Sequence, residues 1–328
     1  MYHSRWKGSH YQAGFQYGSM LSKNNINPFK NFMLKEELLK FTQKCIPLYQ
    51  AFYPEILEEI QGIAEGLKVE QKIVAVFLCS MYCFLLENRC SCFAFCKDNQ
   101  IILAKNSDFL TSVEKVCDSP YYHLNSGYSF IGNTTAWSEI EDGINEHGLA
   151  AALTFIYPTK IAEGFNAGML VRYLLEKCQT TSQAIQALQK LPIASAQTIT
   201  LADKNGDIAI VECNCDKVVV RKPKNGFLFT TNHFISPEMI IYQYQGEDDC
   251  YSHQRYQTML SAFENHILSL SFAMDLLSGK KGFLCQYDRK KGMDTIWSAI
   301  YDLTANKIYR VEGNPSRKRF KEDMRFHF

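Results

Sequence analysis

The chain has 328 residues, a length that suits about two ordinary domains or one large one. Hydrophobic residues make up 46% and charged residues 21%, which excludes wholesale disorder and a fibrous repeat. The 35 Lys and Arg against 34 Asp and Glu leave a net charge of +1, so the overall charge gives no reason to expect nucleic acid or an anionic membrane as a partner.

Residues 11–86 predict an all-helical first quarter of the chain. Residues 54–67 begin with Pro and carry isoleucines on one stripe, which indicates an amphipathic surface helix. The longest apolar run, residues 73–86, is shorter than the about 18 to 20 residues that cross a bilayer, so we interpret it as a buried helix. The N-terminus lacks the apolar core of about 7 to 15 residues of a secretory signal, which favours a cytoplasmic protein.

The pattern changes after residue 87. Strand-like runs at 92–96 and 101–105 flank a turn signal at 97–100 and predict a β-hairpin. Further strands are expected at 128–131, 149–157, 197–202, 208–213, 217–221, 226–231, 296–303 and 307–311. Helices are expected at about 169–178, 182–191, 252–264 and 268–277. With no linker after residue 90, we expect one layered α+β catalytic body preceded by a helical segment.

The 12 cysteines and 8 histidines raise the question of a metal site. The sequence has no Cys-x-x-Cys and no His-x-x-x-His, so we predict no metal and no cofactor. Without a secretory signal the thiols are expected to be reduced rather than paired. No glycine-rich phosphate loop and no Gly-x-Ser-x-Gly is present, which argues against nucleotide and serine-hydrolase chemistry.

Cys90 lies where the helical segment gives way to the first strand. Such a cysteine is as often a small core residue as a reactive one. If the hairpin turn is centred on residues 98–99, paired residue numbers sum to about 197, which puts Cys90 opposite Ser107 to within one residue. Asp108 then lies beside Cys90, and Lys105 lies close to both. Because only the thiolate attacks, a nearby cation that lowers the thiol pKa makes Cys90 a candidate nucleophile.

The thiol also needs a base, and the sequence places no histidine next to it. A Cys-His pair with His147 or His233 would have to be formed by folding. The other source is the α-amino group that Cys90 gains if the chain is cut just before it, whose pKa of about 7.7 to 8.0 suits proton transfer near neutrality.

The order of several motifs resembles the acyl-coenzyme A:6-aminopenicillanic acid acyltransferase-like family of N-terminal-nucleophile (Ntn) hydrolases, relatives of choloylglycine hydrolase and penicillin V acylase. Cys90-Ser-Cys-Phe-Ala94 resembles its nucleophile motif, and Asn106-Ser-Asp108-Phe109 its Asn-x-Asp-aromatic motif. The other segments that carry the resemblance are residues 8–18, 53–66, 142–149, 231–233, 252–256 and 313–315. Each motif is weak alone, but their shared order is specific.

The resemblance implies a four-layer αββα Ntn-hydrolase sandwich and self-cleavage of the Arg89-Cys90 bond. Residues 1–89 would then be a propeptide-like α chain and residues 90–328 the catalytic β chain. Carried over by position, Cys90 is the nucleophile, Asp108 orients its α-amino group, Asn232 donates to the oxyanion and Arg255 holds them in register. Lys105 and Thr154 are secondary site residues.

Three positions depart from the family pattern. Arg89 stands where the family often has a small residue, which bears on the cleavage step. Lys105 stands where choloylglycine hydrolases carry Arg; because Lys lacks the planar fork of Arg, bidentate recognition of a bile-acid-type substrate is not expected. Cys92 falls where Ser or Thr is usual and is a second, less favoured nucleophile candidate.

The sequence thus predicts a cysteine amidohydrolase or acyltransferase that forms an acyl-enzyme from a small-molecule N-acyl amide. A papain-like Cys-His protease using His147 or His233, or a non-enzymatic thiol-rich binding protein, are the alternatives. The acyl group, the leaving amine, the choice between water and an amine acceptor and the oligomeric state, a homo-oligomer included, stay open at this point.

Overall fold

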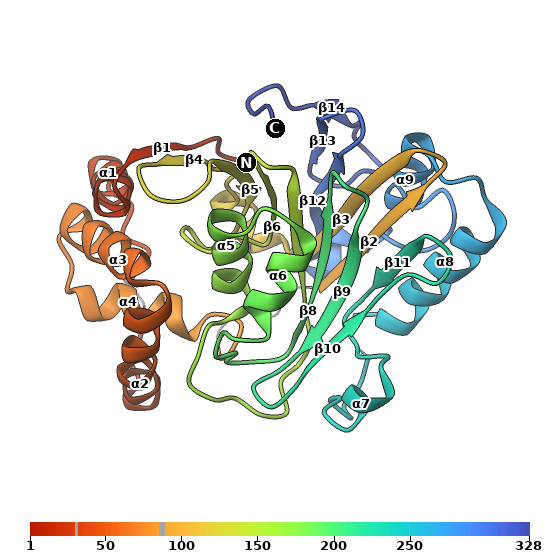
Figure 1. The fold of residues 1–328 in the computed structure, drawn as a ribbon. Coiled ribbons are helices and arrows are strands. Elements are labelled where there is room, and N and C mark those ends of the chain that lie inside the picture. Colours follow the sequence, from red (N-terminus) through yellow and green to blue (C-terminus); the bar gives the residue numbers. More distant parts are fainter. Residues whose placement is uncertain (30–31, 85–88, 249) are drawn as a thin grey trace.

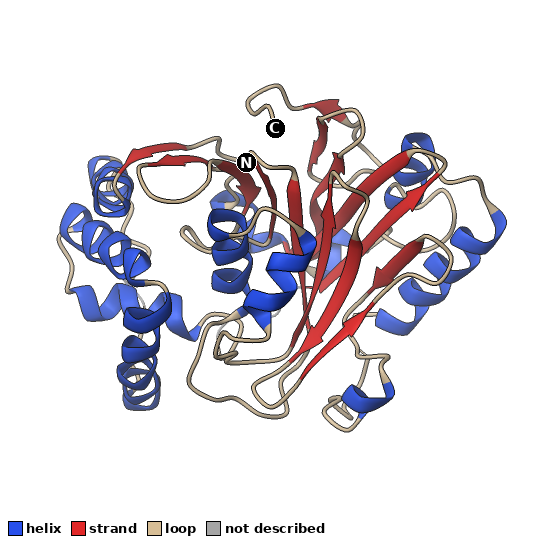
Figure 2. Cartoon of the chain, viewed as in Figure 1, coloured by secondary structure: helices blue, strands red, loops and turns tan. Residues whose placement is uncertain are grey.

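The computed structural model describes residues 1–328 except 30–31, 85–88 and 249. Two β-sheets face each other, and each carries helices on its outer side (Figure 1). Figure 2 shows the strands in the middle of the molecule, with helices gathered on either side of them. This arrangement confirms the predicted α+β fold with four αββα layers.

The first sheet has eight strands in the order β1-β4-β5-β6-β7-β8-β9-β10. Apart from the parallel β1–β4 pair, its neighbours run antiparallel. Its strands are β1 (Arg5–Gly8), β4 (Tyr121–Leu124), β5 (Phe130–Asn133), β6 (Asp142–Asn145), β7 (Leu149–Phe155), β8 (Gln197–Asp203), β9 (Ile208–Cys213) and β10 (Val218–Arg221). The sequence did not predict β1, β4 or β6, each only four residues long.

The second sheet has six strands in the order β11-β2-β3-β12-β13-β14. Its strands are β11 (Phe227–Thr230), β2 (Arg89–Lys97), β3 (Gln100–Leu110), β12 (Met293–Asp302), β13 (Lys307–Glu312) and β14 (Lys321–Glu322). The β2–β3 hairpin turns at Asp98 and Asn99, whose φ angles of 49° and 60° are those that a tight two-residue hairpin turn requires. Cys90 pairs with Ser107, which confirms the predicted register.

Three apolar layers hold the sandwich together. Ala150 and Ala152 of β7 pack between the sheets against Cys92 and Ala94 of β2. Outside the first sheet lie α5 (Ala167–Lys177) and α6 (Thr181–Leu188), and outside the second lie α8 (Ser252–Asn265) and α9 (Leu270–Leu277). Three shorter elements are α7 (Pro237–Ile240) and the 3₁₀ turns η1 (Thr111–Val116) and η2 (Arg289–Lys291).

The described part of residues 1–89, which was predicted to be helical, holds β1 and four helices: α1 (His10–Lys23), α2 (Glu36–Phe52), α3 (Pro54–Leu67) and α4 (Gln71–Ser80). Helix α4 ends at Ser80, earlier than the predicted residue 86, and Tyr82 has a left-handed φ of 57°. The last residues of that prediction, 85–86, lie outside the described residues. Within the described parts of the chain, no helix has the length and apolar character needed to cross a membrane.

Helices α1 and α3 touch backbone to backbone through paired glycines. A Cβ added to Gly62 would lie 2.2 Å from the Tyr11 carbonyl oxygen, and one added to Gly18 would lie 2.2 Å from that of Ile63. Gly14 and Gly66 are equally crowded by backbone atoms of the facing helix. The glycines of the 8–18 and 53–66 motifs therefore set the spacing of this helix pair.

We expect Gly62→Ala to destabilise the protein although alanine favours helix by about 1 kcal/mol over glycine. The new methyl group must push the two helices apart, and overpacking of this kind costs about 1 to 3 kcal/mol. Urea unfolding measures the change, with the exposed Glu58→Ala in the same helix as control. Equal or higher stability of Gly62→Ala would contradict the close packing.

A buried charge network joins the N-terminal segment to the first sheet's helices. Arg172 of α5 pairs with Glu59 of α3 at 2.9 Å and with Glu176 at 2.5 Å. Glu176 also accepts from the Tyr53 hydroxyl at 2.6 Å and contacts His10 at 2.9 Å. Burial acts to raise the pKa of Glu176, but Arg172 and His10 outweigh it and lower that pKa to about 2.

Candidate active site

Cys90 is the second residue of β2 and is fully buried. Because side chains alternate along a strand, Cys90 points to the same face as Cys92, between the two sheets. Its register partner on β3 is Ser107, and Lys105 is the register partner of Cys92 on the same face. The hairpin thus places the thiol in the interior, with a lysine two residue pairs further along.

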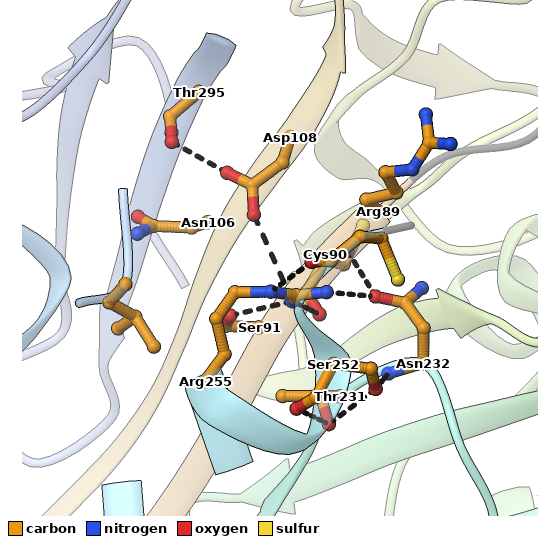
Figure 3. A network of polar contacts seen from close by, with 12 residues as sticks. Arg89, Cys90, Ser91, Asn106, Asp108, Thr231, Asn232, Ser252, Arg255 and Thr295 are labelled. Carbon is orange, nitrogen blue, oxygen red and sulfur yellow. Dashed lines mark hydrogen bonds and ion pairs between the residues drawn. The ribbon is translucent and has the colours of Figure 1, made fainter. Parts of the chain in front are cut away.

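The backbone of Cys90 is held at both its N–H and its carbonyl oxygen (Figure 3). Its N–H donates to Asn232 Oδ1 at 3.0 Å, and its carbonyl oxygen accepts from Arg255 Nη1 at 2.6 Å. Arg255 Nη2 also donates to Asn232 Oδ1 at 2.7 Å, and Nη1 to Ser91 Oγ at 3.0 Å. One guanidinium therefore ties the Cys90 backbone to the Asn232 side chain.

Asp108 joins the network from the other side. Its carboxylate lies 3.9 Å from Arg255 Nη1 and accepts from Tyr287 at 3.0 Å and Thr295 at 2.6 Å. In the β2–β3 strand register, Asp108 is paired with Arg89. The group that accepts from the Cys90 N–H is Asn232. Burial raises the pKa of Asp108 to about 6, against the opposing pull of Arg255.

Asn232 lies just after β11 and is fixed by its surroundings. Its backbone N–H donates to Ser252 Oγ at 2.9 Å, and Nδ2 donates to the Phe155 carbonyl oxygen at the end of β7 at 2.7 Å. Ser252 is the first residue of α8, the helix that also carries Arg255. Two residues that the sequence separates by 23 positions thus contact the backbone of Cys90 from one corner of the fold, Asn232 at its N–H and Arg255 at its carbonyl oxygen.

Lys105 is fully enclosed on the thiol side of the hairpin. Its ammonium donates to the Glu141 carbonyl oxygen at 3.1 Å and lies 3.6 Å from the Asp142 carboxylate. The Glu141 carboxylate is 3.8 Å away and accepts from Ser107 at 3.1 Å. Burial acts to lower the pKa of Lys105, but Cys90 in its thiolate form and the Asp142 and Glu141 carboxylates raise it above the ordinary value.

The thiol itself is neutral in this environment. Burial raises the pKa of Cys90 to about 12, and the Lys105 charge opposes that rise. Burial likewise raises the pKa of Cys92 to about 12, so ionisation does not separate the two candidates. Their surroundings do, because in the described part of the chain the backbone of Cys90, and not that of Cys92, is bonded by Asn232 and Arg255.

Thr154 lies on β7 opposite Thr198, on the face that packs between the sheets. Its hydroxyl is buried and has no hydrogen-bond partner in the described part of the chain. The structure therefore puts Thr154 on the inter-sheet side of the sandwich, where Cys90 also points, without a contact that assigns it a role.

The structure does not bring the two candidate histidines to the thiol. His147 precedes β7, whose other end holds Asn232, so about 20 Å of strand separates them. His233 Nδ1 lies 2.7 Å from Ser252 Oγ, and its ring faces His253 at 4.2 Å. Burial and His253 lower the pKa of His233 to about 4. Neither geometry supports a Cys-His pair.

Tyr287, Thr295 and Glu141 contact the candidate site residues, and the sequence analysis did not single them out. The first two hold Asp108, and Glu141 lies with Lys105. Thr295 could have been found, because β12 pairs with β3 and places it opposite Asp108. No motif marks Tyr287, which follows an irregular stretch. Within the described residues, no cluster of His, Cys, Asp and Glu is arranged to hold a metal ion.

Residues 95–317 match the family described as acyl-coenzyme A:6-aminopenicillanic acid acyl-transferase. The matched range includes Asp108, Asn232 and Arg255 and begins five residues after Cys90. No curated protein matches the chain in sequence.

Several solved structures are similar. A variant of the conjugated bile acid hydrolase from Clostridium perfringens is 13% identical with a TM-score of 0.51, covering 71% of this chain and 92% of that one. Penicillin V acylase from Agrobacterium tumefaciens is 15% identical with a TM-score of 0.43, covering 68% and 82%. The Caenorhabditis elegans ortholog of N-acylethanolamine-hydrolyzing acid amidase is 15% identical with a TM-score of 0.49, covering 65% and 93%. The first of these shows a shared fold.

Proposed function

Because the chain belongs to the acyl-coenzyme A:6-aminopenicillanic acid acyl-transferase family, we propose that it is a cysteine Ntn enzyme that cuts linear amides through an acyl-enzyme on Cys90. The observation that carries this proposal is the Asn232–Arg255 network around the Cys90 peptide group. These contacts fix the one nitrogen that would become the catalytic amine.

The first step is cleavage of the Arg89-Cys90 bond. The Cys90 sulfur attacks the Arg89 carbonyl carbon, the C–N bond breaks, and the thiol proton passes to the departing nitrogen. Breaking the C–N bond has then already freed the Cys90 α-amino group, and water hydrolyses the resulting thioester, which returns the thiol and leaves a carboxylate on Arg89. Asn232 and Arg255 support this step by holding the N–H and the C=O of Cys90 in place.

In turnover the neutral α-amino group takes the thiol proton and the sulfur attacks the substrate carbonyl. Asn232 donates to the oxyanion through Nδ2, which carries two N–H groups. The leaving amine takes the proton, and water or a second amine then collects the acyl group. Asp108, held by Tyr287 and Thr295, orients the amine once cleavage has freed it. Lys105 supplies positive charge near the thiol.

Residues 1–89 remain attached to residues 90–328 after cleavage in this proposal. The contacts between Arg172 and Glu59, and between Glu176, Tyr53 and His10, are buried and join the two pieces. The apolar face of α3, with Ile56, Ile60 and Ile63, is also fully buried. Each such side chain contributes about 1.5 to 3 kcal/mol.

The acyl-enzyme gives a direct test. Processed protein mixed with a reactive N-acyl amide and stopped in acid should show the acyl mass on the peptide that begins at Cys90. Cys90→Ala should show no adduct, while Cys92→Ala should still process and become acylated. An adduct on Cys92 in place of Cys90, or none with any acyl donor, would overturn the proposed nucleophile.

A further inference from the structure

The side chain of Arg89 occupies space next to the candidate nucleophile. Its Nη2 donates to the Tyr157 hydroxyl at 3.3 Å and its Nη1 to the Met293 sulfur at 3.3 Å. Tyr157 follows β7 of the first sheet, and Met293 begins β12 of the second, so this place bridges the two sheets. Figure 3 shows Arg89 directed away from the Arg255–Asn232 network that grips Cys90.

If the proposed function holds, on which this inference rests, self-cleavage is the enzyme's first turnover. The carbonyl carbon that the sulfur attacks then belongs to Arg89, so the Arg89 side chain stands where the acyl part of a substrate stands. The described groups that contact this side chain are therefore those that would contact the acyl group of a substrate. After cleavage, residues 1–89 end in the Arg89 carboxylate. The Arg89 side chain can then move out of this place while the rest of residues 1–89 stays bound.

We infer that Tyr157 and Met293 form an acyl subsite, and that this subsite prefers acyl groups ending in a flat, hydrogen-bond-donating cation such as a guanidinium. A phenol oxygen and a thioether both accept from N–H donors, and a guanidinium presents five such donors in one plane. The Tyr157 ring lies 5.1 Å from Tyr244 and 5.4 Å from Phe155, which adds aromatic faces of the kind that attract cations.

The reach of the preferred acyl group follows from covalent structure. In arginine the guanidinium carbon lies about six bonds from the carbonyl carbon, so shorter acyl groups leave the contacts with Tyr157 and Met293 unmade. Among the described contacts, a carboxylate at that end would meet the Met293 sulfur and the Tyr157 oxygen, both acceptors, and only the Tyr157 hydroxyl could donate to it. The predicted order of acyl preference is guanidino, then an unbranched apolar chain of the same length, then a carboxylate.

The internal reaction tests the subsite without an external substrate. Full-length chains carrying Arg89→Met or Arg89→Glu should cleave before Cys90 at least about 10-fold more slowly than the wild type. Each Arg89 variant is also made together with Cys90→Ala, which is expected to keep the chain uncut. The melting temperatures of these uncut double variants show whether each Arg89 variant folds. If the wild type cleaves and both variants cleave at the wild-type rate, the subsite inference is overturned while the proposed function stands. A wild type that never cleaves would overturn the proposed function instead.

The external reaction tests it again on processed protein. Acetyl-arginine anilide should have a kcat/KM at least about 10-fold above that of acetyl-norleucine anilide, and acetyl-glutamate anilide should be poorest. Tyr157→Phe should lower the ratio of the arginine to the norleucine kcat/KM by at least about 5-fold, because the phenol oxygen that accepts from the guanidinium is lost. Rates that do not differ between the three anilides, measured on protein that forms an acyl-enzyme, would overturn the subsite.

Discussion

Arg255→Ala is expected to lower the free energy of unfolding by about 3 to 5 kcal/mol at pH 7, because it leaves the buried Asp108 carboxylate without its cation. Burial already raises the pKa of Asp108 to about 6, and loss of Arg255 would raise it further. A carboxyl whose folded-state pKa exceeds its unfolded value destabilises when ionised, so the deficit should shrink as the pH falls from 7 toward 4.

Denaturant unfolding at pH 7 and pH 4 measures this effect. The double variant Arg255→Ala with Asp108→Asn is the matched control, since it removes the cation and the buried charge together and should recover part of the lost stability. A single variant as stable as the wild type at pH 7 would show that Arg255 and Asp108 do not form a coupled buried pair.

Arg255→Ala should also change the pH profile of the processed enzyme. If the α-amino group of Cys90 is the base, it must be neutral, and an unneutralised Asp108 favours the charged ammonium. The rising limb of kcat/KM should therefore move to higher pH in Arg255→Ala and to lower pH in Asp108→Asn, which also turns over more slowly. Unchanged limbs in both variants, after complete processing, would exclude these residues from the site.

Asn232→Ala is expected to fold and to lose about 10² to 10³-fold in kcat, because removing an oxyanion donor costs about 2.7 to 4 kcal/mol in the transition state. The variant also loses the acceptor of the Cys90 N–H, so processing should slow as well. Fragment masses give the processing rate, and turnover of purified processed protein gives kcat.

Asn145→Ala serves as the control for Asn232. Asn145 is also buried and bonds the carbonyl oxygens of Leu175 and Cys178, at the far end of β7 from Asn232. Its loss should cost stability without changing kcat per folded molecule. Asn232→Ala with a wild-type kcat would reduce Asn232 to a structural residue at the end of β11.

The hairpin was predictable because its rules are local. A two-residue turn at Asp98 and Asn99 fixes every pair along β2 and β3, so Cys90 opposite Ser107 followed from sequence and was confirmed. The same reason explains why the sequence predicted four helices to within a few residues, α5, α6, α8 and α9. The apolar periodicity that marks a helix involves only residues that are close together in the sequence.

The rest depends on contacts between distant segments. Strands β1, β4 and β6 were missed although the equally short β5, β10 and β11 were predicted; they exist as strands because neighbouring strands pair with them. The meeting of Arg255 with Asn232, Tyr287 with Asp108 and Lys105 with Asp142 likewise follows from how the two sheets and α8 pack. The family resemblance suggested part of this set, and residue spacing alone gives none of it.

An intact mass measurement of the purified full-length protein under denaturing conditions tests the central claim most directly. We predict two chains that purify together, one of residues 1–89 and one that begins at Cys90, and a single uncut chain for Cys90→Ala. A wild-type protein that remains one chain of 328 residues and still turns over N-acyl amides at full rate would contradict the account.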